Sequence, residues 1–313
     1  MAINDSNLNI LVLFFFANTE GKMGDDVKKI SFRSKTPLRC PICSNEFFRE
    51  ELFSGGGRLI AGKLTSELRR TYEENAKFGK IYPMAYILNV CPRCLYVSFQ
   101  KDFENLLPEE IDKIRNMSQA RIDTVKKYFG NIDFNSDRTL AHGAASYLLA
   151  VDIYGLRNKK VAPTFKRAIA SIRAAWLFAD LAKEKPDIPY GKISEFFYNK
   201  AYSFYGMVLE LFQNGGEPVE AAGNLGPDTD KNWGYEGVLF LYSSLTVKIG
   251  ARESDLQKRL ENLERTKRYL SRIFGIGKST KQKPGPLIDM TRDMYDKMNA
   301  MIEEIKGQSE PNQ

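Results

Sequence analysis

The four cysteines of this 313-residue chain fall into two close pairs, and their spacing predicts a metal site. Each pair has two residues between its thiols, in Cys40-Pro-Ile-Cys43 and in Cys91-Pro-Arg-Cys94. Two such knuckles can direct four thiolates at one ion, which is the ligand set of a tetrahedral zinc site with Zn–S bonds of about 2.3 Å. Because no cysteine is left over, we expect one zinc ion bound by Cys40, Cys43, Cys91 and Cys94.

The predicted zinc is structural, because four protein thiolates leave no coordination position for water or substrate. Two redox CxxC pairs or buried free thiols are the alternatives. A CxxC pair that exchanges disulfides normally opens a helix within a βαβ unit, a setting that the sequence does not suggest for either pair. Residues 44–90, which separate the two pairs, are expected to fold out as an insertion in a split zinc ribbon.

The other residues that could do chemistry form no complete site. His142 is the single histidine, and acid–base or triad chemistry would need a carboxylate and a nucleophile beside it. We expect it at the surface or at a helix start. Asp133, Asp137 and Asp152 follow no metal-ligand spacing and are interpreted as helix caps and solvated side chains.

A second incomplete motif is Gly277-Lys278-Ser279, which resembles the end of a phosphate loop. The motif needs a glycine at position 272, where this chain has Arg272, and it should follow a strand rather than a helix. We interpret the segment as a helix end followed by a basic loop, and we expect the protein not to be an enzyme.

Basic residues concentrate between positions 265 and 283, which contain no acid, although the whole chain has a net charge of only +7. Tyr269 and Phe274 lie among these charges, as stacking on nucleobases would require. The same rings also suit a helix that packs its apolar face inward. Two interpretations stay open, a solvated helix face or a polyanion-binding patch. The patch would consist of Arg265, Lys267, Arg268, Arg272 and Lys278.

The composition, 43% apolar and 27% charged, is typical of an ordinary globular protein. Paired metal-ligating thiols indicate a reducing compartment, so we expect a cytoplasmic location. The apolar run at 10–17 is shorter than the roughly 20 residues that span a bilayer. No basic residue precedes Lys22, which argues against a signal peptide. The run is either a buried strand or part of a leader that precedes a true start at Met23.

The elements that must position the cysteines are predicted from periodicity and turn residues. We expect a short charged helix over 65–77 and a strand over 84–90 that leads into the second knuckle. A helix is expected to begin at Pro108. Apolar residues then recur at three- and four-residue intervals, which predicts helices around 140–154, 165–185 and 193–214. Further helices are expected near 235–249, 253–274 and 286–306.

These elements predict a mainly α protein, in which a small α+β zinc-ribbon module precedes an all-α, tetratricopeptide-like array of helical hairpins. Alanine-rich and aromatic-rich helices favour close antiparallel pairing, and a compact helical bundle is the alternative. The expected divisions are a leader or disordered segment (1–23), a split zinc ribbon with an inserted helix (24–107), the helical domain (108–306) and a disordered tail (307–313).

The residues CPICSNEF at 40–47 and CPRCLYVSFQKDF at 91–103, with ASYLLAVDIYGL and IRAAWLFADLAKE after them, resemble an uncharacterised bacterial family. That family, a domain of unknown function, has a split zinc ribbon ahead of tetratricopeptide-like helices. The resemblance covers about residues 35–215. Many members have glycine after each knuckle, where this chain has Ser44 and Leu95. The resemblance implies the fold and the zinc ligands, and no established activity.

Three functions follow as hypotheses. The first is a scaffold or adaptor that binds protein partners through its helical hairpins, in the assembly of a larger cellular structure. The second is a nucleic-acid-binding protein that uses the stretch 265–283. The third, an enzyme with an unrecognised site, is the least favoured. The identity of the partner and the oligomeric state do not follow from the sequence.

Overall fold

A computed structural model describes residues 29–53, 55–275 and 285–309. The predicted leader at 1–23 and the apolar run at 10–17 lie outside these ranges. Within the described ranges, the strands and short 3-10 turns are β1 (Ser31–Arg33), β2 (Leu38–Arg39), β3 (Glu46–Phe47), β4 (Glu50–Leu52), β5 (Ile60–Leu64), β6 (Arg70–Glu73), η2 (Pro83–Tyr86), β7 (Leu88–Val90), β8 (Val97–Phe99), η3 (Gln100–Asp102), η4 (Lys159–Val161) and η5 (Gly250–Arg252). The helices are α1 (Pro108–Asn116), α2 (Ser118–Phe129), α3 (Leu140–Tyr154), α4 (Pro163–Glu184), α5 (Tyr190–Asn214), α6 (Val219–Ala222), α7 (Gly234–Lys248), α8 (Leu256–Gly275) and α9 (Gly285–Ser309).

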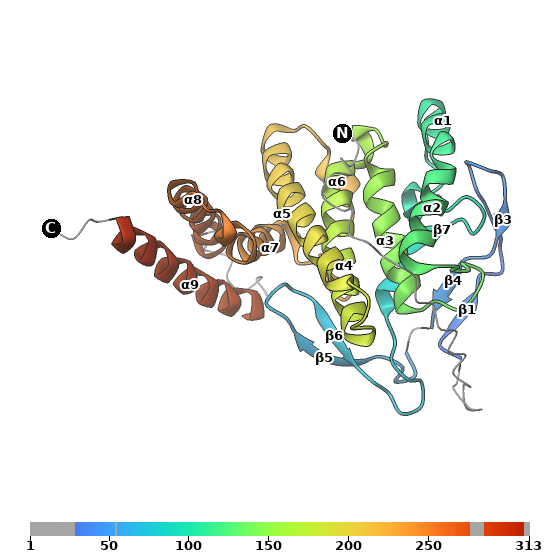
Figure 1. Cartoon of the computed structure of the whole chain (residues 1–313), viewed down its shortest axis with the longest axis horizontal. Helices are drawn as coiled ribbons and strands as arrows, with labels where there is room; N and C mark the ends of the chain where they lie inside the picture. The colour runs from blue at the N-terminus through green and yellow to red at the C-terminus, as the bar shows by residue number, and fades with distance from the viewer. Residues whose placement is uncertain (1–28, 54, 276–284, 310–313) are drawn as a thin grey trace.

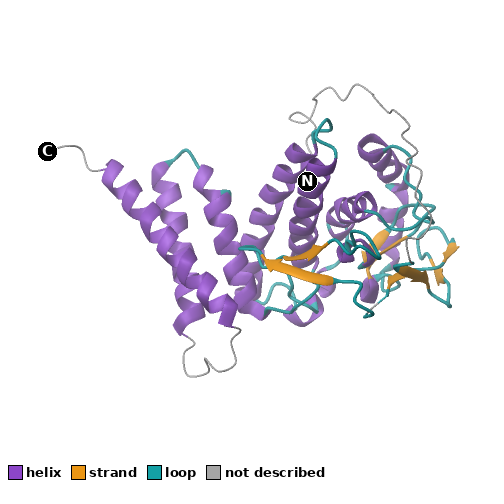
Figure 2. Ribbon diagram, turned by 90° about the horizontal axis from the view of Figure 1, so that it is seen from below, coloured by secondary structure: helices purple, strands orange, loops and turns teal. Residues whose placement is uncertain are grey.

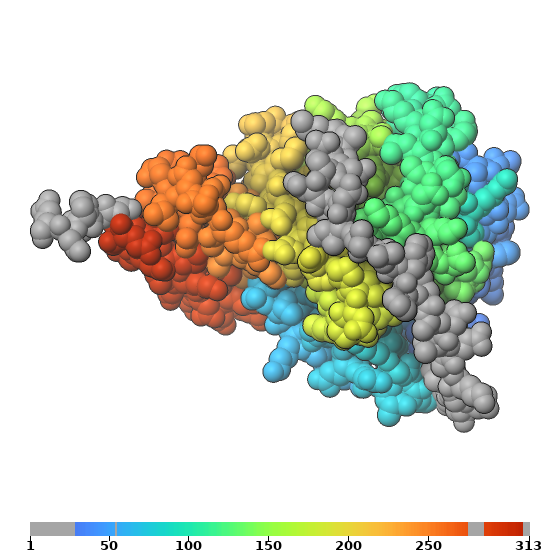
Figure 3. Space-filling view, in the orientation of Figure 1, coloured from blue at the N-terminus to red at the C-terminus, as the bar shows by residue number. Residues whose placement is uncertain are grey.

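The architecture is mainly helical, with the strands gathered in the N-terminal third of the chain, so the predicted fold class is confirmed. The strands form antiparallel pairs, β1–β4, β2–β3, β5–β6 and β7–β8. Apart from the short α6, which lies beside α4, the helices follow one another in chain order along the long axis of the molecule, from α1 and α2 at one end to α8 and α9 at the other (Figure 1). The space-filling view shows the same progression at the surface (Figure 3).

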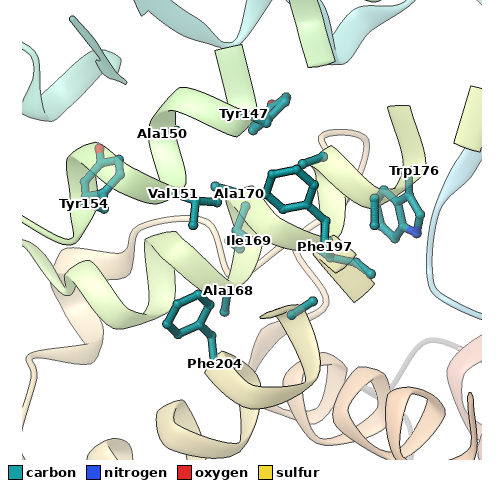
Figure 4. Packing of buried hydrophobic residues seen from close by; sticks show 14 of the residues in the cluster. Tyr147, Ala150, Val151, Tyr154, Ala168, Ile169, Ala170, Trp176, Phe197 and Phe204 are labelled. Carbon is teal, nitrogen blue, oxygen red and sulfur yellow. The ribbon is translucent and has the colours of Figure 1, made fainter. Parts of the chain in front are cut away.

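Alanines set the close spacing of the central helices. Ala144 and Ala150 on α3 and Ala168 and Ala174 on α4 are fully buried. Because these side chains are small, α3, α4 and α5 approach closely, and large rings fill the remaining space. Figure 4 shows this arrangement around Trp176, which is 2% exposed. The alternation of small and large residues therefore explains why the three predicted helices pack as a continuous array.

Local signals define the ends of these helices. Pro163 occupies the first turn of α4, where a missing N–H leaves no intrahelical bond unmade. Gly215 ends α5 in the left-handed conformation, with φ +64°. The predicted helices near 140–154, 165–185, 193–214 and 235–249 are therefore confirmed within a few residues. Helix α9 continues to Ser309, so the first residues of the predicted disordered tail at 307–313 are helical.

The predicted helix at 65–77 is wrong. Strands β5 and β6 pair there as an antiparallel hairpin, with a turn between them. In that turn the Thr65 hydroxyl accepts hydrogen bonds from the backbone N–H groups of Glu67 (3.3 Å) and Arg69 (3.1 Å). Threonine competes in this way with a helical backbone. The predicted strand at 84–90 is shorter than expected, because η2 occupies its first residues and β7 begins at Leu88.

The tip of this hairpin packs against the helices (Figure 2). Leu68 is fully buried, and the Glu67 carboxylate accepts hydrogen bonds from three helices. The donors are Trp176 Nε1 on α4 (2.5 Å), the Tyr198 hydroxyl on α5 (2.9 Å) and Lys248 Nζ on α7 (2.6 Å). The insertion between the two cysteine pairs is thus attached to the helical array at its tip.

His142 lies in the first turn of α3 and is 5% exposed, so the helix-start prediction is confirmed and the surface prediction is wrong. Its Nδ1 lies 3.2 Å from the backbone nitrogen of Thr139, which donates to it, and its Nε2 lies 3.0 Å from the carbonyl oxygen of Asp133. These bonds fit a neutral ring with its proton on Nε2. A second proton would place an N–H on Nδ1 against the N–H of Thr139.

This geometry predicts a pH dependence of stability. Burial lowers the pKa of His142, so the unfolded chain binds a proton at a higher pH than the folded chain does. The stabilisation is intact above the ordinary histidine pKa of about 6.5 and is lost as the pH falls from there toward the lower folded pKa. Urea unfolding at pH 7.5 and pH 5.5 should show the parent losing more stability than His142→Asn, whose amide oxygen keeps the acceptor without titrating. Parallel losses in the two proteins would contradict this account.

Candidate metal centre

Each cysteine pair sits in the turn of a short hairpin. Strands β2 and β3 flank the first knuckle, and β7 and β8 flank the second. In the first, the Ser44 N–H donates to the Cys40 carbonyl oxygen (2.9 Å). In the second, the Leu95 N–H donates to the Cys91 carbonyl oxygen (3.0 Å). The two knuckles therefore have the same backbone hydrogen bonds, although they are far apart in the sequence.

Ser44 and Leu95 adopt the left-handed conformation that glycine favours. Their φ angles are +59° and +53°. The turn geometry that glycine would favour after each knuckle is thus adopted without glycine. An L-residue in this conformation costs about 1–2 kcal/mol, so both knuckles hold a backbone that the surrounding structure must stabilise.

The two knuckles bring all four sulfurs together, as the sequence analysis predicts. Every pair of Sγ atoms lies within 4.8 Å, and the Cys40–Cys94 and Cys43–Cys91 distances are both 3.6 Å. A tetrahedral site with Zn–S bonds of about 2.3 Å requires S–S separations of about 3.8 Å. The cluster therefore has the ligand number and close to the spacing that a zinc ion needs.

The cluster is shielded from solvent, and its thiols shift one another's pKa. Cys40, Cys91 and Cys94 are buried, and Cys43 is half-buried. Hydrogen bonding to Cys91 raises the pKa of Cys40. Hydrogen bonding to Cys40 in turn lowers the pKa of Cys91. A divalent cation would displace the remaining protons, because thiolates rather than thiols ligate metals.

One arginine from α1 and one from α2 donate hydrogen bonds to backbone carbonyl oxygens of the knuckles. Arg115 Nε donates to the Ile42 carbonyl oxygen of the first knuckle (3.1 Å). Arg121 donates to the Cys94 carbonyl oxygen of the second knuckle through Nε (3.3 Å) and Nη2 (3.1 Å). Neither arginine was predictable from the sequence, because nothing in their spacing marks them as partners of cysteines so distant in the chain.

A buried polar network behind the second knuckle joins it to the helices. The Asp102 carboxylate accepts hydrogen bonds from the Tyr154 hydroxyl on α3 (2.6 Å) and Lys166 Nζ on α4 (2.5 Å). Glu110 on α1 pairs with Arg157 (3.4 Å). Because the acids and bases are matched, the network fixes the ribbon against the helical array. The segment after the second knuckle, which carries the family resemblance, supplies Asp102.

The remaining candidate residues are dispersed. Asp133 accepts a hydrogen bond from the Asn135 backbone (2.8 Å), as a turn residue does. Asp152 is half-buried on α3, where burial raises its pKa. The phosphate-loop-like Gly277-Lys278-Ser279 lies entirely outside the described residues. Within the described residues, neither Asp133 nor Asp152 joins the cysteine cluster.

The described part of the basic stretch belongs to α8, and its exposed arginines lie on one side of that helix. Arg265, Arg268 and Arg272 are exposed, whereas Leu270 and Ile273 are buried. The predicted inward apolar face is therefore confirmed, and the exposed arginines remain as a row beside it. Lys267 Nζ lies 5.0 Å from the centre of the Tyr295 ring on α9.

A groove forms where the hairpin tip meets α7 and α9. It has a volume of about 450 Å³ and is lined by both apolar and charged side chains, and the apolar ones are here called its floor. We call it the hairpin groove, and its principal residues are Glu67, Phe240, Val247, Lys248, Met290 and Met294. The groove was not predictable from the sequence, since it joins three segments that are distant in the chain.

Comparison with known proteins agrees with this picture. Residues 34–298 match a family described as "Uncharacterized protein conserved in bacteria (DUF2225)". The chain belongs to this family. The match confirms the resemblance inferred from residues 35–215 and extends it through most of the helical array. The CxxC…CxxC arrangement fits a zinc ribbon.

A relative from Borreliella burgdorferi, with the printed name "Uncharacterized protein", is 39% identical over 281 residues. The alignment covers 90% of this chain and 100% of that protein. No solved structure matches the chain. In the described part of the chain, no helix combines the length and the apolar character that crossing a bilayer requires.

Proposed function

We propose that the protein is a non-catalytic cytoplasmic scaffold or adaptor, in which one structural zinc ion holds the split ribbon and the helical array binds a protein partner. Four thiolates from the chain complete a tetrahedral coordination sphere, which leaves no position for a substrate. The single histidine serves as a buried helix-start residue, as described above. Both features favour a binding role over an enzymatic one.

The observation that carries the binding role is the hairpin groove. Its apolar floor is formed by Phe240, Val247, Met290 and Met294, and methionine side chains adapt readily to different apolar partners. Glu67 and Lys248, which also line the groove, form an ion pair of 2.6 Å. We infer that an amphipathic peptide or helix from a partner places its apolar side chains on this floor.

A charge placed in the floor should abolish partner binding. We expect tagged parent protein to retain a defined set of proteins from native cells after nuclease treatment. Met290→Asp should lose that set, because binding would bury an unpaired carboxylate. Met207→Asp, at a methionine on α5 that is 48% exposed and outside the groove, is the matched control and should keep the set. Equal retention by both variants would refute binding in the groove.

Nucleic-acid binding is the second candidate function, and the row of exposed arginines on α8 favours it. Among the described residues, no ion pair is formed by Arg265, Arg268 or Arg272. The logarithm of the binding constant for nucleic acid should fall linearly with the logarithm of the salt concentration. Replacing the three arginines with glutamine should reduce both the affinity and the steepness of this salt dependence. Unchanged binding in that variant, or retention that persists after nuclease, would exclude this role for α8.

A further inference from the structure

Arg121 on α2 is a buried cation whose hydrogen bonds all go to uncharged groups. The residue is 4% exposed. Besides the Cys94 carbonyl oxygen, its guanidinium donates to the Ile114 carbonyl oxygen (2.7 Å) and the Ser118 hydroxyl (3.0 Å). These bonds satisfy the N–H groups, but they do not neutralise the charge.

Three other buried cations in the described residues form ion pairs with carboxylates, whereas Arg173, equally buried, forms none but interacts electrostatically with the Asp228 carboxylate. Arg157 pairs with Glu110 (3.4 Å), Lys166 pairs with Asp102 (2.5 Å), and Arg138 lies 3.7 Å from Glu50. Within residues 29–53, 55–275 and 285–309, Arg121 has no such ion pair. A buried charge without a counter-charge destabilises a fold by several kcal/mol. An anion other than a carboxylate, close to Arg121, would supply the missing counter-charge.

The cysteine cluster can supply that anion. Four thiolates around one divalent cation carry a net charge of −2, and Arg121 holds the carbonyl group of one of the four cysteines. We propose that Arg121 is the counter-ion of the zinc–tetrathiolate centre and a positioning residue for its second knuckle. This inference rests on the proposed zinc site.

The arrangement also assigns a role to the α1–α2 pair. Arg121 on α2 donates hydrogen bonds to the second knuckle, and Arg115 on α1 donates one to the first. These bonds attach α1 and α2 to the metal centre. The two arginines differ in their electrostatic setting. The Arg115 side chain is 54% exposed and pairs with Asp112 (2.9 Å), so its charge is already compensated. Arg115 therefore provides a matched control that makes a similar backbone contact without the buried charge.

The test is the affinity of the full-length protein for Co²⁺, measured by competition with a chelator at fixed pH and followed by the sulfur-to-cobalt charge-transfer absorption. We expect Arg121→Met to bind Co²⁺ about 10- to 100-fold more weakly, as loss of groups that support metal ligands usually does. Arg121→Lys, which keeps the charge, should recover most of this loss. Arg115→Met should remain close to the parent.

Each outcome has a distinct meaning. Helical circular dichroism at saturating Co²⁺ establishes that each variant is folded, and Arg121→Gln replaces the methionine variant if that one does not fold. Parent-like affinity in the neutral variants would overturn the counter-ion role alone. Equal losses in the lysine and neutral variants would also overturn it, because geometry rather than charge would then matter. A parent that binds no Co²⁺ would refute the metal site itself.

Discussion

Replacing Cys91 with serine is expected to remove the zinc ion and unfold the ribbon. Cys91 is fully buried, and its sulfur lies 3.6 Å from that of Cys43. Binding of structural zinc contributes about 10–16 kcal/mol in small zinc domains, and a serine hydroxyl is a poor substitute for a thiolate. Metal analysis should show about one zinc ion per parent chain and close to none in the variant. The thermal unfolding midpoint should fall by many degrees.

The matched control for this substitution is Arg93→Ser, which changes an exposed residue in the same knuckle. It should keep its zinc and the parent's melting temperature. If Cys91→Ser retained a full equivalent of zinc and melted like the parent, the structural role of the metal would be refuted.

Replacing Leu68 with alanine is expected to destabilise the helical array, although Leu68 belongs to the ribbon's insertion. The side chain is fully buried, and its Cδ1 would lie 3.6 Å from a Cβ added to Gly237 on α7. Loss of a buried leucine side chain typically costs about 2–5 kcal/mol. The backbone at this position has φ +60° in the parent, and alanine would bear the same strain. The loss therefore reports on packing.

Urea unfolding followed by helical circular dichroism measures this effect. Leu59→Ala, at a leucine of the same insertion that is 37% exposed, is the control and should change stability by less than about 0.5 kcal/mol. Equal stability of the two variants would show that the hairpin tip does not support the helices.

The cysteine knuckles were predictable because their chemistry is local. Two cysteines separated by two residues supply two of the four ligands of a tetrahedral zinc site. The chain has two such pairs and no other cysteine, so the complete ligand set follows from the sequence. The left-handed conformations of Ser44 and Leu95 did not follow from residue type. They result from the turn that each knuckle must make to aim both sulfurs at one point.

The helices were predictable for a related reason. Apolar periodicity marks their buried faces, and Pro163 and Gly215 mark two of their ends. These signals act within one or two turns of the chain, so they can be recognised without knowledge of the tertiary contacts.

The hairpin and the supporting contacts were not predictable from local patterns. Residues 65–77 are charged and carry no apolar alternation, so they resemble a solvated helix. Tertiary contacts made by Glu67 and Leu68 stabilise a hairpin there instead. Arg121 shows the same limit, since its partner Cys94 lies on a different element and only the folded chain brings them together.

The most direct test of the proposed metal centre is X-ray absorption at the zinc edge on protein purified without added metal. We expect about four sulfur neighbours at about 2.3 Å and no nitrogen or oxygen in the first coordination shell. That result would establish a closed tetrathiolate site formed by Cys40, Cys43, Cys91 and Cys94. A shell that contains oxygen or nitrogen, or a protein that purifies without zinc, would contradict the account.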